Sequence, residues 1–137
     1  MKQSEWGLID VIVNNAGIER HGAIEEMDLS VFKDVMETNY FGTVAFTKSI
    51  MPIYLKQGYG WFAIVSSFAG VMGIPGRSAY AASKGGLKML TRNMATEWAK
   101  YNIQVNAVAP NFIETPGTEP WLKDPEFRQS VLDRIPL

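Results

Sequence analysis

A tyrosine and a lysine four positions apart, Tyr80 and Lys84, lie in the stretch SAYAASKGG, whose other residues are serine, alanine and glycine. Residues four apart on a helix project from the same face, one turn from each other. A phenol titrates near pH 10, too high for a base at neutral pH, but a cation within about 4–6 Å lowers that pKa by roughly 1–3 units. Such a pair could exchange a proton with a substrate oxygen, as the interconversion of an alcohol and a ketone requires.

A third group with the right chemistry is the hydroxyl of Ser67, which ends the stretch WFAIVSS. It could hydrogen-bond the same substrate oxygen. The small residues around Tyr80 and Lys84 would let another backbone segment or a flat ligand come close. By itself, a tyrosine and a lysine at this spacing is more often a solvated surface pair, so the motif needs support from the rest of the chain.

The elements that must position these groups alternate along the sequence. Three apolar runs, residues 8–13, 61–67 and 103–110, read as buried strands. Helical spacing joins them over residues 29–52, with Asp28 or Ser30 as the cap, and over residues 78–101, with Leu87, Leu90, Met94 and Trp98 as the core stripe. This order predicts a single α/β domain whose parallel sheet is covered on both faces.

Polar residues collect where the predicted strands end. The first run ends in Asn14, Asn15, Ala16 and Gly17, and the third is followed by Pro110, Asn111 and Thr115. Ligands of parallel sheets bind at the carboxyl ends of the strands, so one rim of the sheet should hold the site. A further helix is predicted after Asp124, with Pro125 at its first position.

Composition excludes several other functions. The 137 residues are 47% hydrophobic, carry a formal net charge of -1 and show no basic block, which argues against nucleic acid as a partner. No apolar run reaches the roughly 20 residues that cross a bilayer, so no membrane partner is expected. The chain has no cysteine, and its one histidine, His21, is interpreted as a surface residue, so no metal site is predicted. We expect a cytoplasmic protein.

Five motifs together resemble the short-chain dehydrogenase/reductase family, of the classical type. They are NNAG at 14–17, TNYFGT at 38–43, Ser67 at its distance before Tyr80, YAASK at 80–84 and VNAVAPNFIET at 105–115. The resemblance implies a doubly wound Rossmann-like fold, NAD or NADP as cofactor and a small alcohol or ketone as substrate. It also implies a homo-oligomer, a dimer or tetramer, with contacts on the helix faces around Ala81 and Gly85.

Residue roles follow from the same resemblance. Tyr80 is implied as the acid/base, Lys84 as the group that lowers its pKa and holds the nicotinamide ribose, Ser67 as the group that orients the substrate oxygen, and Asn39 as the support of a proton-relay water. The resemblance places the cofactor against Asn14, Ala16 and Gly17 on the adenosine side, and against Pro110, Ile113 and Thr115 on the nicotinamide side. The segment of Trp121 and Phe127 is implied as a lid, although simple packing would also explain these residues. Asn39 could alternatively satisfy a buried backbone group. The distance to Tyr80 in the resemblance singles out Ser67, so Ser66 is interpreted as structural.

The chain departs from the family pattern at both ends. The family's opening strand and glycine-rich turn, which hold the cofactor pyrophosphate, have no counterpart before Leu8, and the last strand is missing after DRIPL. We expect residues 1–137 to form one partial Rossmann-like domain of the three-layer type. On its own, such a piece should bind a dinucleotide weakly and associate through its unpaired strands, Asp10 to Val13 and Gln104 to Ala109.

Two other functions remain open from the sequence. Asn111 stands where the family usually has glycine, and the segment after it also resembles halohydrin dehalogenases, which use no nicotinamide cofactor and carry arginine where this chain has Lys84. Lysine therefore favours the redox enzyme. The chain could also be an inactive packing or oligomerisation module, which a cofactor titration would separate from the enzymes. Substrate identity is not readable, because the loops at 70–77 and 112–123 show no anchoring charge pattern.

Overall fold

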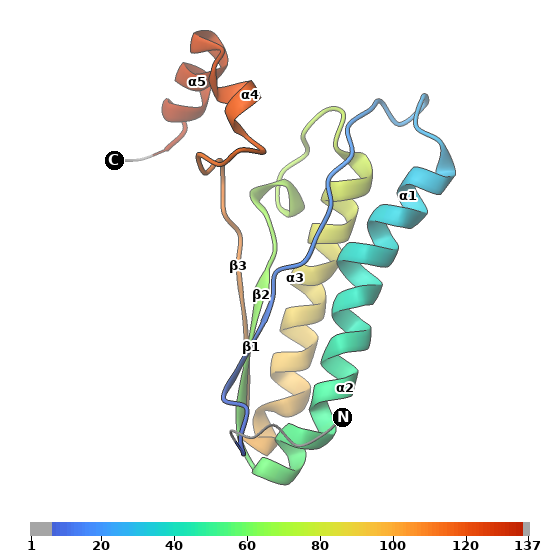
Figure 1. The fold of residues 1–137 in the computed structure, drawn as a ribbon, viewed down its shortest axis with the longest axis vertical. Helices are drawn as coiled ribbons and strands as arrows, with labels where there is room; N and C mark the ends of the chain where they lie inside the picture. The colour runs from blue at the N-terminus through green and yellow to red at the C-terminus, as the bar shows by residue number, and fades with distance from the viewer. Residues whose placement is uncertain (1–6, 136–137) are drawn as a thin grey trace.

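A computed structural model of the chain describes residues 7–135, and three parallel strands form its sheet (Figure 1). They are β1 (Val11–Asn14), β2 (Gly60–Val65) and β3 (Ile103–Val108), in the order β1-β2-β3. Trp61 of β2 is paired with Val11 on one side and with Gln104 on the other. All three predicted strands are confirmed, and within the described residues β1 and β3 each pair on one side only.

The first helical segment is one rod made of three parts. α1 (Leu29–Met36) continues through a π-helical turn, η1 (Glu37–Phe41), into α2 (Gly42–Gln57). The predicted end at Pro52 was wrong by five residues, because the helix is closed by Gly58, whose φ of 81° lies in the left-handed region.

A side-chain cap defines the residue at which the α1–α2 rod begins. The carboxylate of Asp28 accepts a hydrogen bond from the backbone N–H of Ser30 at 2.7 Å, so Asp28 is the cap and Ser30 lies within the first turn. The carboxylate of Asp124 accepts in the same way from the N–H of Glu126 at 3.0 Å. Both caps were predicted from the sequence, the first as one of two choices.

The second long helix, α3 (Ser78–Trp98), ends in a short 3-10 turn, η3 (Ala99–Tyr101), as the predicted range of 78–101 required. Another 3-10 turn, η2 (Phe68–Gly70), follows β2. After β3 the chain forms two short helices, α4 (Glu119–Leu122) and α5 (Pro125–Leu132), which lie beyond the carboxyl ends of the strands (Figure 1).

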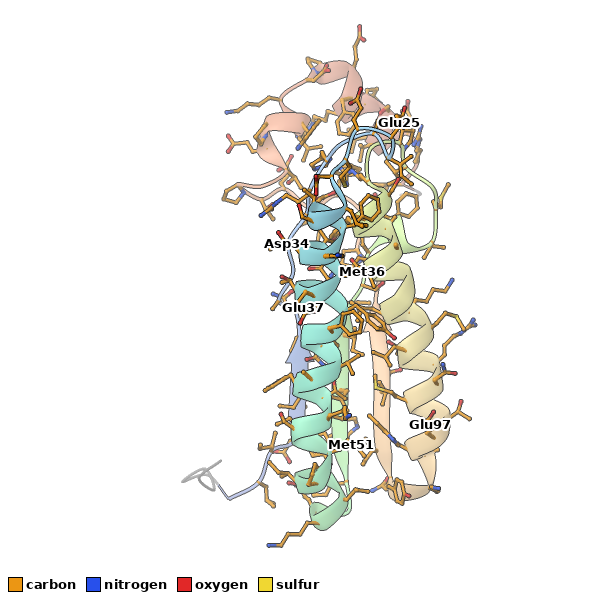
Figure 2. The ribbon with its side chains drawn as sticks, turned by 90° about the vertical axis from the view of Figure 1, so that its right-hand side faces the viewer. Glu25, Asp34, Met36, Glu37, Met51 and Glu97 are labelled. Carbon is orange, nitrogen blue, oxygen red and sulfur yellow. The ribbon has the colours of Figure 1, made fainter. Side chains whose placement is uncertain are left out.

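The helices form one layer against the sheet. In Figure 2, the α1–α2 rod and α3 lie side by side in front of the strands. Both crossovers step the same way along the sheet, and right-handed crossovers in one direction put their helices on one face. Their shared core consists of Ile50, Tyr54, Phe62, Ile64, Leu87, Met94, Ile103 and Val105, with Leu90 and Trp98 packed against it.

The opposite face of the sheet shows a different surface. Val11, Val13, Trp61 and Val108 alternate with core residues and are 38–59% exposed. The α/β class with a parallel sheet is confirmed, while residues 7–135 supply one of the two helix layers expected. Among those residues, no helix has both the length and the apolar character needed to cross a membrane.

Candidate active site

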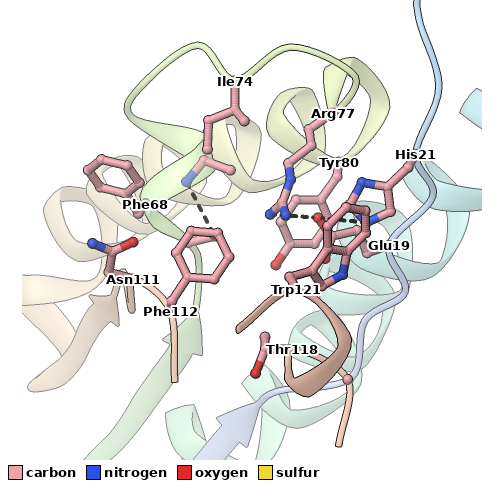
Figure 3. Close-up of a pocket in the computed structure, with 13 residues that line it drawn as sticks. Glu19, His21, Phe68, Ile74, Arg77, Tyr80, Asn111, Phe112, Thr118 and Trp121 are labelled. Atoms are coloured by element: carbon pink, nitrogen blue, oxygen red, sulfur yellow. Dashed lines mark hydrogen bonds and ion pairs between the residues drawn. The ribbon is translucent and has the colours of Figure 1, made fainter. Parts of the chain in front are cut away.

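The three strands end at one rim, and a cavity of about 130 Å³ opens there. Ser67, which follows β2, and Tyr80, in the first turn of α3, both line it (Figure 3). The backbone N–H of Phe68 donates to the carbonyl of Pro110 at 3.0 Å, which fastens the loop after β2 to the end of β3. The predicted convergence of Ser67 and Tyr80 is therefore present.

The surroundings of Ser67 and Tyr80 affect their chemistry differently. Ser67 caps η2, and its hydroxyl accepts a hydrogen bond from the N–H of Ala69 at 3.2 Å. Burial raises the pKa of the Tyr80 phenol above its ordinary value of 10.0, and the hydrogen bond with Ser67 acts in the opposite direction. The net direction is the reverse of the lowering expected from the Tyr80–Lys84 spacing, because burial outweighs the groups that favour the phenolate.

Lys84 lies one turn further along α3 and is only 3% exposed. Its ammonium donates a hydrogen bond to the carbonyl of Val65 at 2.7 Å and lies 5.6 Å from the centroid of the Tyr80 ring. Burial lowers the pKa of Lys84 below its ordinary value. The surface-pair interpretation of Tyr80 and Lys84 is thus wrong for the lysine, which is enclosed at the end of β2.

Ser66 has the structural role that the sequence suggested. Its hydroxyl, buried at 3% exposure, donates to the backbone carbonyl of Lys84 at 2.9 Å. This bond ties the end of β2 to the middle of the helix that carries Tyr80. Lys84 is therefore bound to the end of β2 twice, by its backbone carbonyl to Ser66 and by its ammonium to Val65. These two bonds fix the position of Lys84 relative to the strand end.

The small residues around Lys84 admit other backbone, as predicted. A Cβ placed on Gly70 would lie 2.6 Å from the carbonyl carbon of Lys84, and one on Gly85 would lie 3.4 Å from the carbonyl oxygen of Gly70. A Cβ on Gly86 would lie 3.1 Å from the ring of Tyr40. Gly85 thus lies in close contact with the turn η2 of the same chain.

Asn39 is fully buried in the π-helical turn η1. Its side-chain oxygen accepts from the N–H of Ile18 at 2.7 Å, and its amide nitrogen donates to the carbonyl of Ile18 at 2.9 Å and to the hydroxyl of Ser83 at 3.0 Å. The side chain therefore does what the alternative interpretation expected: it satisfies buried backbone groups. It also links the segment after β1 to α3, and such π-helical turns are frequent at functional sites.

The predicted cofactor residues after β1 fall into two kinds. The amide of Asn14 is buried and donates to the hydroxyl of Thr47 at 3.2 Å, which anchors β1 to α2, while Ala16 and Gly17 are exposed. A Cβ on Gly17 would lie 3.2 Å from Oδ1 of Asn39 and 3.5 Å from Nζ of Lys84. The absence of a side chain at Gly17 therefore lets the backbone after β1 lie close to Asn39 and Lys84.

The residues predicted after β3 are less closely gathered. The carbonyl of Pro110 accepts the hydrogen bond from Phe68 in η2. Ile113, in contrast, is 58% exposed, and the hydroxyl of Thr115 lies 3.1 Å from that of Thr118. Neither Ile113 nor Thr115 lines the cavity beside Tyr80, whereas Thr118 does. Of the two residues interpreted as part of a lid or as packing, Trp121 lines this cavity and Phe127 lines the adjoining one.

Several lining residues were missed by the sequence reasoning. Arg77 forms an ion pair with Glu19 at 2.9 Å and lies over the ring of Phe112, 5.5 Å from its centroid (Figure 3). His21 is exposed, as expected, and also packs against Trp121, with ring centroids 5.1 Å apart and ring planes tilted by 37°. Arg77 stands three residues before Tyr80, a helical spacing that could have identified it. Glu19 comes from another segment and had no such signal.

Comparisons with known proteins agree with this geometry. The family model described as short chain dehydrogenase matches residues 2–126. The chain is 46% identical over 134 residues to a 3-oxoacyl-(acyl-carrier-protein) reductase of Thermotoga maritima, covering 97% of this chain and 53% of that protein. It is 41% identical over 135 residues to a 2-(R)-hydroxypropyl-CoM dehydrogenase of Xanthobacter autotrophicus, covering 96% and 54% respectively.

A solved structure shares the fold. The gluconate 5-dehydrogenase of Burkholderia cenocepacia, in complex with NADP and tartrate, superposes with a TM-score of 0.90 at 30% identity, over 96% of this chain and 52% of that one. The chain thus spans about half the length of the relatives it matches. Together with the Tyr80, Lys84 and Ser67 arrangement, these matches show that the chain belongs to the short-chain dehydrogenase/reductase family.

Proposed function

We propose that the protein is an NAD(P)-dependent oxidoreductase that interconverts a secondary alcohol and a ketone. The observation that carries the proposal is the position of Ser67 and Tyr80 on one cavity, with the buried ammonium of Lys84 one helical turn beneath Tyr80. A proton donor and acceptor, a second hydroxyl and a fixed positive charge are the groups that such a reaction needs.

The proton step follows from these positions. In the oxidation direction, the hydroxyl of Ser67 hydrogen-bonds the substrate oxygen, and the Tyr80 phenolate accepts the proton of the alcohol as its C–H bond breaks. In the reduction direction, the Tyr80 phenol donates the proton to the oxygen of the ketone. Burial raises the pKa of Tyr80, which favours the phenol form that donates the proton in the reduction direction.

The residues present fit the nicotinamide end of a dinucleotide. Gly17 lies close to Lys84, whose ammonium makes one hydrogen bond within the described residues, to Val65, and keeps N–H groups for ribose hydroxyls. When bound, the nicotinamide would supply the acceptor or donor of the hydride. We propose Asn14, Ala16 and Gly17, with Pro110, Ile113 and Thr115, as the remaining contacts of the cofactor.

The relatives favour this proposal over a dehalogenase without a nicotinamide cofactor. The matched proteins are named as reductases and dehydrogenases, and the Burkholderia cenocepacia structure contains NADP. The lysine at position 84 agrees with them.

We further propose that the protein is a homo-oligomer. Large apolar side chains lie exposed on the α1–α2 rod, with Leu29 at 65%, Phe41 at 50% and Phe46 at 45% exposure. A contact between two copies would cover them. Size-exclusion chromatography with light scattering should give a mass of two or four subunits, and a monomer at micromolar concentration would contradict this proposal.

The experiment that tests the activity uses the protein expressed from its complete reading frame. NAD⁺ and NADP⁺ are titrated by calorimetry, and reduction of each is followed by absorbance with a panel of secondary alcohols. Binding of one cofactor and its reduction by at least one alcohol would support the proposal. Failure to bind either cofactor would contradict it and favour the packing module.

A further inference from the structure

The cavity beside Tyr80 has one polar wall built from two distant segments. Glu19 and His21 come from the loop between β1 and α1, and Arg77 immediately precedes α3. Figure 3 shows these three residues gathered with Trp121 beside Tyr80. Apart from Tyr80 itself, they are the titratable side chains that line this cavity within the described residues.

The charges on this wall are paired with each other. The guanidinium of Arg77 lies 2.9 Å from Oε1 of Glu19, and the Arg77 side chain is 15% exposed. Oε1 of Glu19 is shielded from solvent and accepts no well-aligned hydrogen bond, so Arg77 is its charge partner, and the His21 ring lies 3.6 Å away. With neutral His21, the wall carries one negative and one positive charge and no net charge.

A larger cavity of about 390 Å³ continues from the first and shares His21, Arg77, Phe112 and Trp121 with it. Its further lining is mostly apolar: Met72, Pro75, Phe127 and Val131, with Arg134 as its additional cation. A substrate that reaches Tyr80 through this space would therefore place its apolar part between the loop after β2 and α5.

We propose that Glu19 neutralises Arg77 and thereby restricts the substrate cavity to uncharged ketones and alcohols, whose apolar substituent occupies the adjoining cavity. This inference rests on the oxidoreductase activity proposed above and names its substrate class. Glu19 and Arg77 are then specificity-determining residues.

The physical reason is the cost of an unpaired charge in a partly buried site. An anionic group near Arg77 would have to compete with Glu19 for the guanidinium and would meet the like charge of the carboxylate, which is unfavourable. An uncharged substrate meets a wall whose charges are already compensated. If Glu19 loses its charge, Arg77 becomes an uncompensated cation, and the same cavity should accept an anion.

The pair also bears on the acid/base group. Tyr80 is faced by Glu19 and Arg77 from the cavity wall, by Ser67 from the end of β2 and by Lys84 from α3. The charge of Glu19 raises the pKa of Tyr80, and that of Arg77 lowers it. Removal of the Glu19 charge should therefore shift the rising limb of the pH profile for alcohol oxidation to lower pH, an effect that a purely structural Glu19 would not have.

The test compares two substrates that differ in charge, acetoacetate and methyl acetoacetate, as competing ketones for the protein expressed from its complete reading frame. The variants are Glu19→Gln, Arg77→Gln, the double variant, and Glu25→Gln as a control for an exposed carboxylate in the same loop. We measure kcat/KM for reduction, and binding of each compound by calorimetry, so that the comparison remains available without turnover.

Wild type and Glu25→Gln should prefer the neutral ester, Glu19→Gln should shift the ratio about tenfold toward the anion, and the double variant should regain the wild-type preference. A wild-type preference for acetoacetate, an unchanged ratio in Glu19→Gln, or no binding of either compound would overturn the inference. Binding with the expected ratios but without turnover would instead contradict the proposed function alone. If Glu19→Gln does not fold, loss of the preference for the neutral ester in the double variant overturns the inference.

Discussion

The ammonium of Lys84 donates a hydrogen bond to the backbone carbonyl of Val65, the last residue of β2, at 2.7 Å. The strand end and the helix that carries Tyr80 therefore meet at a buried cation. Since burial lowers the pKa of Lys84, the charge is held against a desolvation cost, as is common at functional sites.

Lys84→Met removes this charge while keeping an unbranched side chain. We expect cofactor affinity to fall by roughly 10- to 100-fold, because a hydrogen bond to a charged group is lost, and turnover to fall with it. Calorimetric titration with NAD⁺ and NADP⁺ measures the first effect. Lys88→Met, one turn further along α3, is the control. Equal cofactor affinities in the two variants would contradict the proposed contact between Lys84 and the ribose.

Ser67→Ala and Ser66→Ala form a matched pair. Ser67→Ala should reduce kcat by roughly 10- to 100-fold, and the rising limb of the pH profile for oxidation should move to higher pH, because the Ser67 hydrogen bond holds the pKa of Tyr80 down. Ser66→Ala should lower the melting temperature instead, since it breaks the bond to the carbonyl of Lys84. Unshifted pH profiles in Ser67→Ala would argue against its contact with Tyr80.

Asn39→Leu leaves the N–H and carbonyl of Ile18 without their partner and removes the hydrogen bond that the Ser83 hydroxyl accepts, while that hydroxyl still donates to the carbonyl of Tyr80. The expected loss is roughly 2–4 kcal/mol in the free energy of unfolding, measured by urea denaturation. The exposed Asn93→Leu on α3 should change stability little. A loss below about 1 kcal/mol for Asn39→Leu would show that water replaces these bonds.

Gly70→Ala tests the close packing of η2 on α3. The added Cβ would lie 2.6 Å from the carbonyl carbon of Lys84, so the turn must shift, at a cost of about 1–3 kcal/mol. The same change at Gly73 meets no atom within 4 Å and should be nearly neutral. Melting temperatures of the two variants check this, and similar values would mean that η2 moves freely.

The strands and helices could be predicted because their signals are local. Apolar runs define β1, β2 and β3, and the caps Asp28 and Asp124 act on residues two positions away. The predicted end at Pro52 failed for a physical reason. A proline can lie within a helix, and the left-handed conformation of Gly58 is what closes α2.

The candidate site was predictable only where its members share an element or a strand end. The grouping of Ser67, Tyr80 and Lys84 followed from spacing, but the direction of the Tyr80 pKa depends on burial, which spacing does not give. The ion pair between Glu19 and Arg77 joins residues from opposite sides of β2 in the sequence. Their contact could not be predicted from the sequence, because it exists only in the folded chain.

Tyr80→Phe tests the acid/base role of Tyr80, in the protein expressed from its complete reading frame, with turnover and cofactor affinity measured on the same samples. Only the proton-transferring hydroxyl is lost, so kcat for an alcohol that the wild type oxidises should fall by about 100-fold or more while the Kd for the nicotinamide cofactor changes little. Turnover near the wild-type value in Tyr80→Phe would contradict the assignment of Tyr80 as the acid/base and the proposed mechanism that depends on it.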